Sequence, residues 1–197
     1  MNQSSQPIIH QDKTFTNVNY AEKRLAGREF IHCHFTGCDF SKSDLRNNDF
    51  EDCQFTQCNF SMAQVDGVGF NNALFTNCKM LGVDFTRCNN FMFSFTFSGC
   101  TLDYSTFQGT KLKKTSFKGC TLKETDFSET DLTASVFSDC DLTGAIFSNS
   151  VLEKTDFRTA RNFGIDPNLN KMKKAKFAAS NLAGLLHKYN LDIDFDS

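Results

Sequence analysis

The sequence lacks the features of a secreted or a membrane protein. Its first residues, MNQSSQPIIHQDK, contain neither the basic region nor the long apolar stretch of a secretory signal. No apolar run elsewhere in the chain is long enough to span a bilayer. We therefore expect a cytoplasmic protein with no membrane partner. The odd number of cysteines, nine, argues against a disulfide framework in such a chain.

An excess of charge of either sign is also missing. The 197 residues include 21 basic and 23 acidic side chains, which give a net charge of −2. This balance disfavours a basic nucleic-acid-binding protein and a polyanionic tail. We therefore expect no direct contact with nucleic acid.

Signatures of catalysis and of cofactor binding are absent as well. The sequence contains no glycine-rich phosphate loop, no nucleophile elbow and no zinc-ribbon spacing. The segment His32-Cys33-His34 is similar to a metal-binding cluster, but alternate residues of an extended segment point to opposite sides. Cys33 then faces inward while the two histidines face outward. We expect no enzyme activity, no cofactor and no metal.

Phenylalanine is what the sequence has in excess, and it follows a period of five. Tryptophan is absent and there are only two prolines and three tyrosines, against 23 phenylalanines. From Tyr20 to Phe85 every fifth residue is large and apolar, and the period resumes, shifted by two residues, from Phe97 to Phe157. A period of five fits neither an α-helix nor a simple strand.

Small residues occupy a second position, two residues before most of the large ones. One large and one small side chain then point inward in every five residues, and four such sides close a square coil of 20 residues. In the second block phenylalanine and leucine alternate, which places Phe97, Phe117, Phe137 and Phe157 in one column. Successive coils would hydrogen-bond at the strand spacing of ~4.8 Å. The sequence therefore predicts an all-β solenoid with a filled interior.

The repeat divides the chain into an N-terminal tail (1–14), a β-helix (15–160) and a C-terminal cap and dimerisation segment (161–197). The phase slips within 88–96, where two interpretations stay open. Phe91, Phe93 and Phe95 either pack locally at a kinked corner or belong to an exposed bulge that contacts a partner. The candidate contact residues in the slip are Asn89, Asn90, Phe91, Met92 and Phe93.

The C-terminal segment carries two further patterns. Apolar residues at i, i+3, i+4 and i+7 from Leu182 predict an amphipathic helix, with Ser180 or Asn181 as its N-cap. Alternation of apolar residues with aspartate over 191–196 predicts a strand. Such a segment covers the last coil and can pair with a second copy. The candidate dimer residues are Leu182, Leu185, Leu186, Tyr189, Leu191 and Ile193.

Clusters of charge mark the outer surface of the predicted rod. Residues 121–157 carry eight acids against two lysines, and four lysines lie in each of the segments 111–118 and 171–176. An acidic rod of about duplex width could occupy a protein groove that binds DNA. The alternative is a charged surface that only keeps the rod in solution. The candidate partner-binding acids are Glu124, Asp126, Glu129, Asp131, Asp139 and Asp141.

Segments such as CDFSK, SDLRN, TDFSE and CDLTG resemble the A(D/N)LXX motif of the pentapeptide-repeat family. The resemblance implies a right-handed quadrilateral β-helix, here with a short C-terminal helix as cap. CKMLGVDF at 78–85, NFGIDPNLNKMKKAKF at 162–177 and the terminal SNLAGLLHKYNLDID resemble a subgroup that protects topoisomerases, which includes the Qnr quinolone-resistance proteins and immunity proteins of microcin and albicidin producers.

The subgroup resemblance implies a homodimeric DNA mimic. Such a protein binds DNA gyrase, and in some members topoisomerase IV, and protects it from quinolones or peptide toxins. The subgroup has no catalytic residues to carry over. The alternative is a non-enzymatic interaction scaffold with a different partner.

Overall fold

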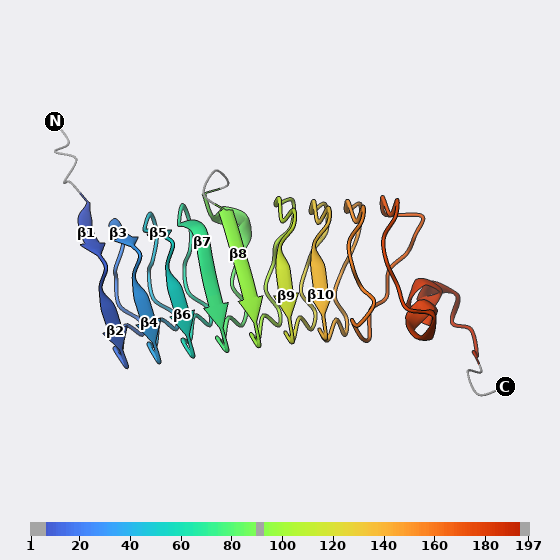
Figure 1. The fold of residues 1–197 in the computed structure, drawn as a ribbon, viewed down its shortest axis with the longest axis horizontal. Helices are drawn as coiled ribbons and strands as arrows, with labels where there is room; N and C mark the ends of the chain where they lie inside the picture. Colours follow the sequence, from blue (N-terminus) through green and yellow to red (C-terminus); the bar gives the residue numbers. More distant parts are fainter. Residues whose placement is uncertain (1–6, 90–92, 194–197) are drawn as a thin grey trace.

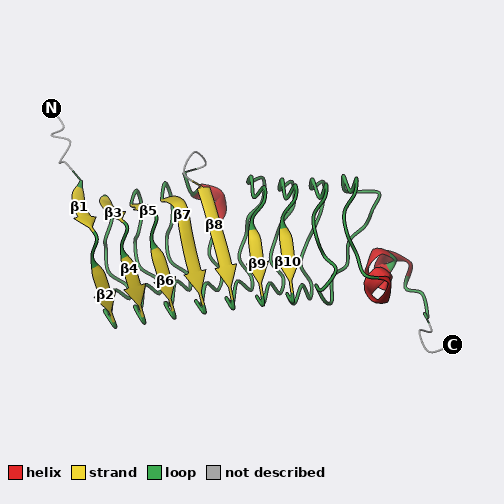
Figure 2. Cartoon of the chain, viewed as in Figure 1, coloured by secondary structure: helices red, strands yellow, loops and turns green. Residues whose placement is uncertain are grey.

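The chain winds into one elongated parallel β-solenoid (Figure 1). The computed structural model describes residues 7–89 and 93–193. Turns and short loops make up most of its C-terminal half (Figure 2). The strands are β1 Ile8–Gln11, β2 Thr14–Thr16, β3 Arg28–Ile31, β4 His34–Thr36, β5 Asp49–Glu51, β6 Gln54–Thr56, β7 Gly69–Thr76, β8 Phe93–Ser98, β9 Ser116–Lys118 and β10 Val136–Ser138. The 3-10 helices are η1 Phe85–Arg87, η2 Ala179–Leu185 and η3 His187–Tyr189.

Each coil hydrogen-bonds to the next one, 20 residues later. Phe15 pairs with Phe35 and Phe35 with Phe55 in parallel register, and single-residue bridges such as that of Asn19 with Asp39 continue the pairing between strands. Residues 20 apart in sequence therefore lie side by side on the rod. The predicted 20-residue coil is confirmed.

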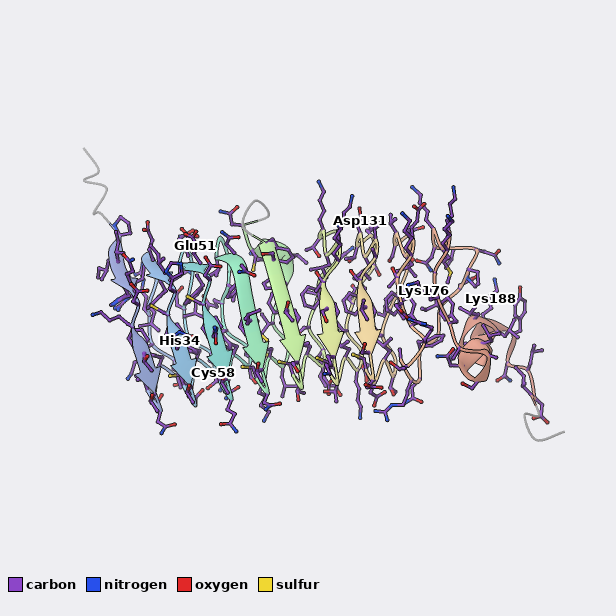
Figure 3. All side chains as sticks on the ribbon, in the orientation of Figure 1. His34, Glu51, Cys58, Asp131, Lys176 and Lys188 are labelled. Atoms are coloured by element: carbon purple, nitrogen blue, oxygen red, sulfur yellow. The ribbon has the colours of Figure 1, made fainter. Side chains whose placement is uncertain are left out.

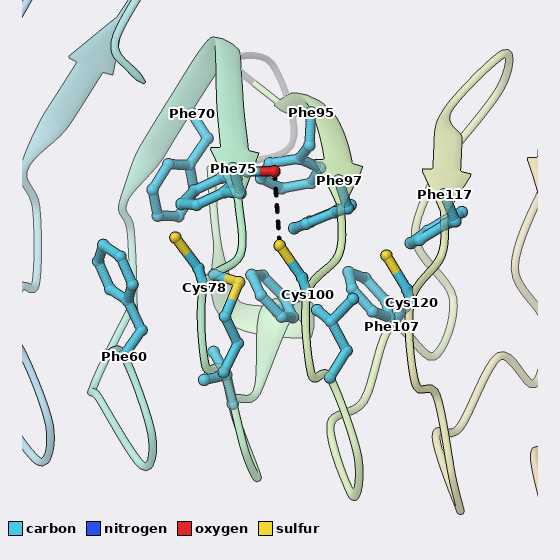
Figure 4. Close-up of a cluster of buried hydrophobic side chains, with 14 of the residues drawn as sticks. Phe60, Phe70, Phe75, Cys78, Phe95, Phe97, Cys100, Phe107, Phe117 and Cys120 are labelled. Carbon is cyan, nitrogen blue, oxygen red and sulfur yellow. Dashed lines mark hydrogen bonds between the residues drawn. The ribbon is translucent and has the colours of Figure 1, made fainter. Parts of the chain in front are cut away.

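Stacked phenylalanine rings fill the interior of the rod. In the predicted column the ring centroids of Phe97 and Phe117 lie 5.3 Å apart, and those of Phe117 and Phe137 lie 4.8 Å apart, with nearly parallel planes. Rings of different columns meet edge-to-face, as Phe107 and Phe117 do at 79°. Both arrangements suit the charge distribution of an aromatic ring. The buried rings near the middle of the rod are shown in Figure 4.

Thiols and hydroxyls in the small position satisfy buried carbonyls of the preceding coil. Thr130 Oγ1 donates to the carbonyl of Phe107 at 2.8 Å, 23 residues earlier. Cys100 Sγ donates to the carbonyl of Phe75 at 3.4 Å, which is the dashed line in Figure 4. All nine cysteines are free and buried. Burial raises the pKa of the Cys53 thiol to about 12, so it stays protonated at neutral pH.

The two extra residues of the phase slip lie between Asn89 and Phe95. Asn89 N donates to Val68 O with the spacing of the earlier coils, whereas Ala73 pairs with Phe95, 22 residues later. Phe95 is 5 % exposed and stands in a column of small residues. Its ring lies 4.4 Å from that of the half-buried Phe93. These two residues pack locally, while the candidates Asn90, Phe91 and Met92 lie outside the described residues.

The solenoid extends further toward both ends than the sequence predicts. Strand β1 pairs with β3, so the first coil begins at Ile8, inside the segment assigned to a tail. At the other end, Asp156 bridges to Lys176, and η2 and η3 follow that last coil. Residues 191–193 form no strand, since nothing in the described part of the chain pairs with them, and Phe195 lies outside it.

The predicted short C-terminal helix cap is present as two 3-10 helices, and the N-cap of η2 is Ala178 rather than Ser180 or Asn181. The Asn181 side chain does not cap the helix. Its amide instead donates to the carbonyls of Phe157 at 3.0 Å and Ala160 at 3.2 Å. A Cβ at Gly184 would lie 2.4 Å from the ring of Phe163, so only glycine fits there. These contacts hold the segment against the last coil.

Replacing Phe117 by alanine should destabilise the fold by about 3–5 kcal/mol, because it removes a ring from a column with no space to collapse. Urea denaturation gives the free energy of unfolding. The control is Lys118→Ala on the outer side of β9, which should stay within about 0.5 kcal/mol of the wild type. Equal losses in the two variants would contradict the stacked column as the main source of stability.

Candidate partner-binding surface

The rod offers its outer surface rather than an enclosed site. An open hollow of about 540 Å³ lies between residues 158–163 and η2 and is lined by Arg158, Arg161 and Asn181 among others. Within residues 7–89 and 93–193, no group of three or more histidines, cysteines or acids is placed to hold a metal ion. In the same residues, no helix has the length and the hydropathy that crossing a bilayer requires.

The His32-Cys33-His34 segment has the alternation that the sequence predicts. Cys33 is buried, while His32 and His34 are exposed on the outside. His32 lies between carboxylates of the neighbouring coils, with Nδ1 3.5 Å from Asp12 and Nε2 3.6 Å from Asp52.

The six candidate acids between residues 124 and 141 do not form one face. That segment is almost a whole coil, so it passes around the rod. Glu124, Glu129 and Asp139 stand at three different corners, each with a positive φ of 52–58°. Asp126, Asp131 and Asp141 lie on three different sides and bridge to different columns.

The three aspartates on the sides hold turns together. Asp131 Oδ1 accepts hydrogen bonds from Thr133 N at 3.1 Å and Thr133 Oγ1 at 2.6 Å, and Asp141 binds Thr143 in the same way. Burial alone would raise the pKa of Asp131, but the hydrogen bonds from Thr133 and Lys113 outweigh it and lower the pKa. The aspartate of the repeat is therefore first of all a structural residue.

Acids that the sequence reasoning missed do lie together, on one long edge in the N-terminal half. Glu29 stands beside Asp49 in the register of β3 and β5, and Glu51 follows on β5. Burial, and in smaller part the charge of Glu51, raises the pKa of Asp49. We call this set the acidic edge, and Glu51 marks it in Figure 3. It consists of Asp12, Glu29, Asp49, Glu51 and Asp52.

A periodic signal for the acidic edge was present in the sequence. Asp12, His32 and Asp52 are spaced by 20, as are Glu29 and Asp49. Counting charge along a sequence window samples all four sides of one coil at once. Counting it at intervals of 20 would have found this edge.

The six candidate dimer residues divide into two groups. Leu185 packs against the core, and Ile193 is half-buried. The other four side chains point outward and are 40–57 % exposed. These are Leu182, Leu186, Tyr189 and Leu191. The cap thus covers the last coil and leaves apolar side chains at the end of the rod.

Comparison with known protein families agrees with this architecture. The pentapeptide repeat region model matches residues 28–107, 48–127, 90–162 and 110–186. The chain belongs to the pentapeptide-repeat family. No curated protein sequence matches it.

Two solved structures of pentapeptide-repeat proteins are similar to this one. HetL, from the cyanobacterium Nostoc sp. strain PCC 7120 and involved in heterocyst differentiation regulation, matches with a TM-score of 0.71 and 15% identity, over 85% of this chain and 84% of HetL. A trypsin-treated form of QnrB1, a plasmid-mediated fluoroquinolone resistance protein, matches with a TM-score of 0.54 and 17% identity, over 98% of this chain and all of that one (100%). At these identities the likeness shows the fold alone.

The turn-holding aspartates of this pentapeptide-repeat protein should make its stability depend on pH. Hydrogen bonds, against the opposing effect of burial, lower the pKa of Asp131 and Asp141, and the Arg158 guanidinium lowers that of Asp156. Their stabilisation is complete above the unfolded-state pKa of about 3.9 and is lost as the pH falls through the lower folded-state values.

Urea midpoints measured between about pH 7 and pH 2.5 should therefore fall at the acidic end. In Asp141→Asn this fall should be smaller, because the amide still accepts from Thr143 but does not titrate. The control is Asp139→Asn, at a corner carboxylate that holds no turn in the described part of the chain. An unchanged acid profile in Asp141→Asn would contradict the assignment.

Proposed function

We propose that this protein is a non-enzymatic DNA mimic that binds DNA gyrase, with topoisomerase IV as a second target, and protects it from inhibitors such as quinolones or peptide toxins. The observation that carries the proposal is the acidic edge on a straight, filled rod. The segments that resemble topoisomerase-protecting proteins support it, and the fold that the chain shares with QnrB1 is compatible with it.

The acidic edge has the physical properties that a groove for DNA selects. Its carboxylates Glu29 and Asp49 stand one coil apart, at ~4.8 Å, against one phosphate per about 3.4 Å on each strand of duplex DNA. Lysine and arginine side chains that line such a groove can pair with the phosphates of DNA or with the carboxylates of the acidic edge. The coils are already joined by backbone hydrogen bonds in the free protein. Binding therefore carries little entropy cost for ordering the backbone.

A supercoiling assay with purified gyrase and a quinolone tests the proposal. The wild type should restore supercoiling and reduce the number of drug-stabilised cleaved complexes. A triple variant of the acidic edge should raise the protein concentration needed for this effect about tenfold or more. It combines Glu29→Gln, Glu51→Gln and Asp52→Asn, and so removes three negative charges from one contact surface. Asparagine suits position 52, because Asn72 has the same positive φ one coil later.

The matched control removes three carboxylates from three different corners, by Glu124→Gln, Glu129→Gln and Asp139→Asn. It should keep most of the activity, since these acids do not share a face. A loss confined to the control would move the binding surface away from the acidic edge. No effect of the wild type on gyrase would refute gyrase protection.

The second candidate function is an interaction scaffold with a different protein partner. The mixture of charges around the rod favours it, and the fold that the chain shares with HetL is compatible with it. A scaffold would leave gyrase unaffected in the assay above.

We also propose that the protein is a homodimer joined through its C-terminal cap. The exposed Leu182, Leu186, Tyr189 and Leu191 at the rod end support this pairing. Leu182→Glu with Leu186→Glu should give a folded monomer in sedimentation experiments, because both side chains are exposed and carry little of the core. The matched control is Ile8→Glu with Ile9→Glu, at two exposed side chains of the opposite end. It should leave the dimer intact. An unchanged dimer in the first variant would place the interface elsewhere.

A further inference from the structure

The fold brings two distant groups of lysines onto one edge of the rod. Lys111 bridges to Asp131, Asp131 to Val151, and Val151 to Lys171, so residues 111–114 and 171–174 lie three coils apart on the same column. Lys154 lies between them. We call the combined set the lysine edge. It consists of Lys111, Lys113, Lys114, Lys154, Lys171, Lys173 and Lys174.

The charge of the lysine edge is largely uncompensated. All seven lysines are exposed, and within the described residues only Lys113 forms an ion pair, at 3.1 Å from Asp131. That carboxylate also accepts from Thr133 and is 25 % exposed. Glu153 is the second acid on these four turns. Ammonium groups held this close to one another repel, and a bound polyanion would relieve that repulsion.

The lysine edge runs along the rod on coils that are joined by backbone hydrogen bonds, and this arrangement limits the shape of its partner. Three coil spacings of ~4.8 Å separate its first and last lysine groups by about 14 Å. A partner must present negative charge repeatedly over that length on a stiff frame. Duplex DNA does so, with one charge per about 1.7 Å of its axis.

The same long edge changes sign along the rod. The column of Lys114, Lys154 and Lys174 continues through Ser94 and Asn72 to Asp52, His32 and Asp12 of the acidic edge. Glu51 and Asp131 mark the two halves in Figure 3. A polyanion is therefore attracted to the C-terminal half of the edge and repelled from the N-terminal half.

We propose that the lysine edge binds the phosphate backbone of duplex DNA. The choice of DNA over another polyanion rests on the proposed function, since duplex DNA is the substrate of the topoisomerases that the acidic edge is proposed to bind. The expectation of no nucleic-acid contact relied on the net charge of −2, which averages the two halves of the rod.

The test uses the full chain and a fluorescent duplex of about 30 base pairs, without gyrase. Anisotropy titrations between about 50 and 200 mM salt should show binding that weakens with salt. In Lys114→Gln, Lys154→Gln and Lys174→Gln combined, the slope of log K against log salt should fall by about 2.7, at about 0.9 per phosphate contact. This variant should fold, because the same column already holds Asp12, His32, Asp52, Asn72 and Ala134.

The matched control is Lys23→Gln, Lys42→Gln and Lys79→Gln, which removes the same charge from the N-terminal half. Its slope should equal that of the wild type. No binding of the wild type at 50 mM salt, equal losses in both triple variants, or binding of polyglutamate but not of duplex DNA would each overturn the proposal. Because gyrase is absent, this result is independent of the supercoiling assay, so failure of one proposal is distinguishable from failure of the other.

Discussion

Stacking of one phenylalanine ring on the next, at the spacing of hydrogen-bonded coils, is the constraint on which the rest of the molecule depends. A coil must return to the same position after 20 residues for Phe117 to meet Phe97 and Phe137. Every outward residue is then placed beside those 20 positions away. The charge and polarity of each face therefore depend on residues spaced by 20 in the sequence. Residues that are neighbours in sequence can face opposite directions.

The fold was predictable because the residues that fill its interior recur in the sequence with a short period of five. The large and small inward positions, the column of Phe117 and the burial of the cysteines all follow from that period. Two features of the structure depart from the period and could not be predicted from it. Phe95 replaces a small residue at the slip, and Gly184 lets the cap lie flat on Phe163, because both depend on contacts between segments that the period does not relate.

The candidate surface was harder to predict for the same geometric reason. The acids from Glu124 to Asp141 are dense in sequence but pass around the rod, and half of them hold turns. The acidic edge and the lysine edge each combine residues from several coils. Together they give one long edge with two signs of charge. Its acidic half suits a groove that binds DNA, and its basic half suits DNA itself.

The most direct test of this account is a photo-crosslinking measurement with DNA gyrase. A benzophenone side chain in place of Glu51 samples the acidic edge, and the same group in place of Glu124 samples a different corner of the rod. The account predicts a crosslink to gyrase from position 51 that an excess of duplex DNA abolishes, and little from position 124. A crosslink from position 124 alone, or one from position 51 that DNA leaves unchanged, would contradict it.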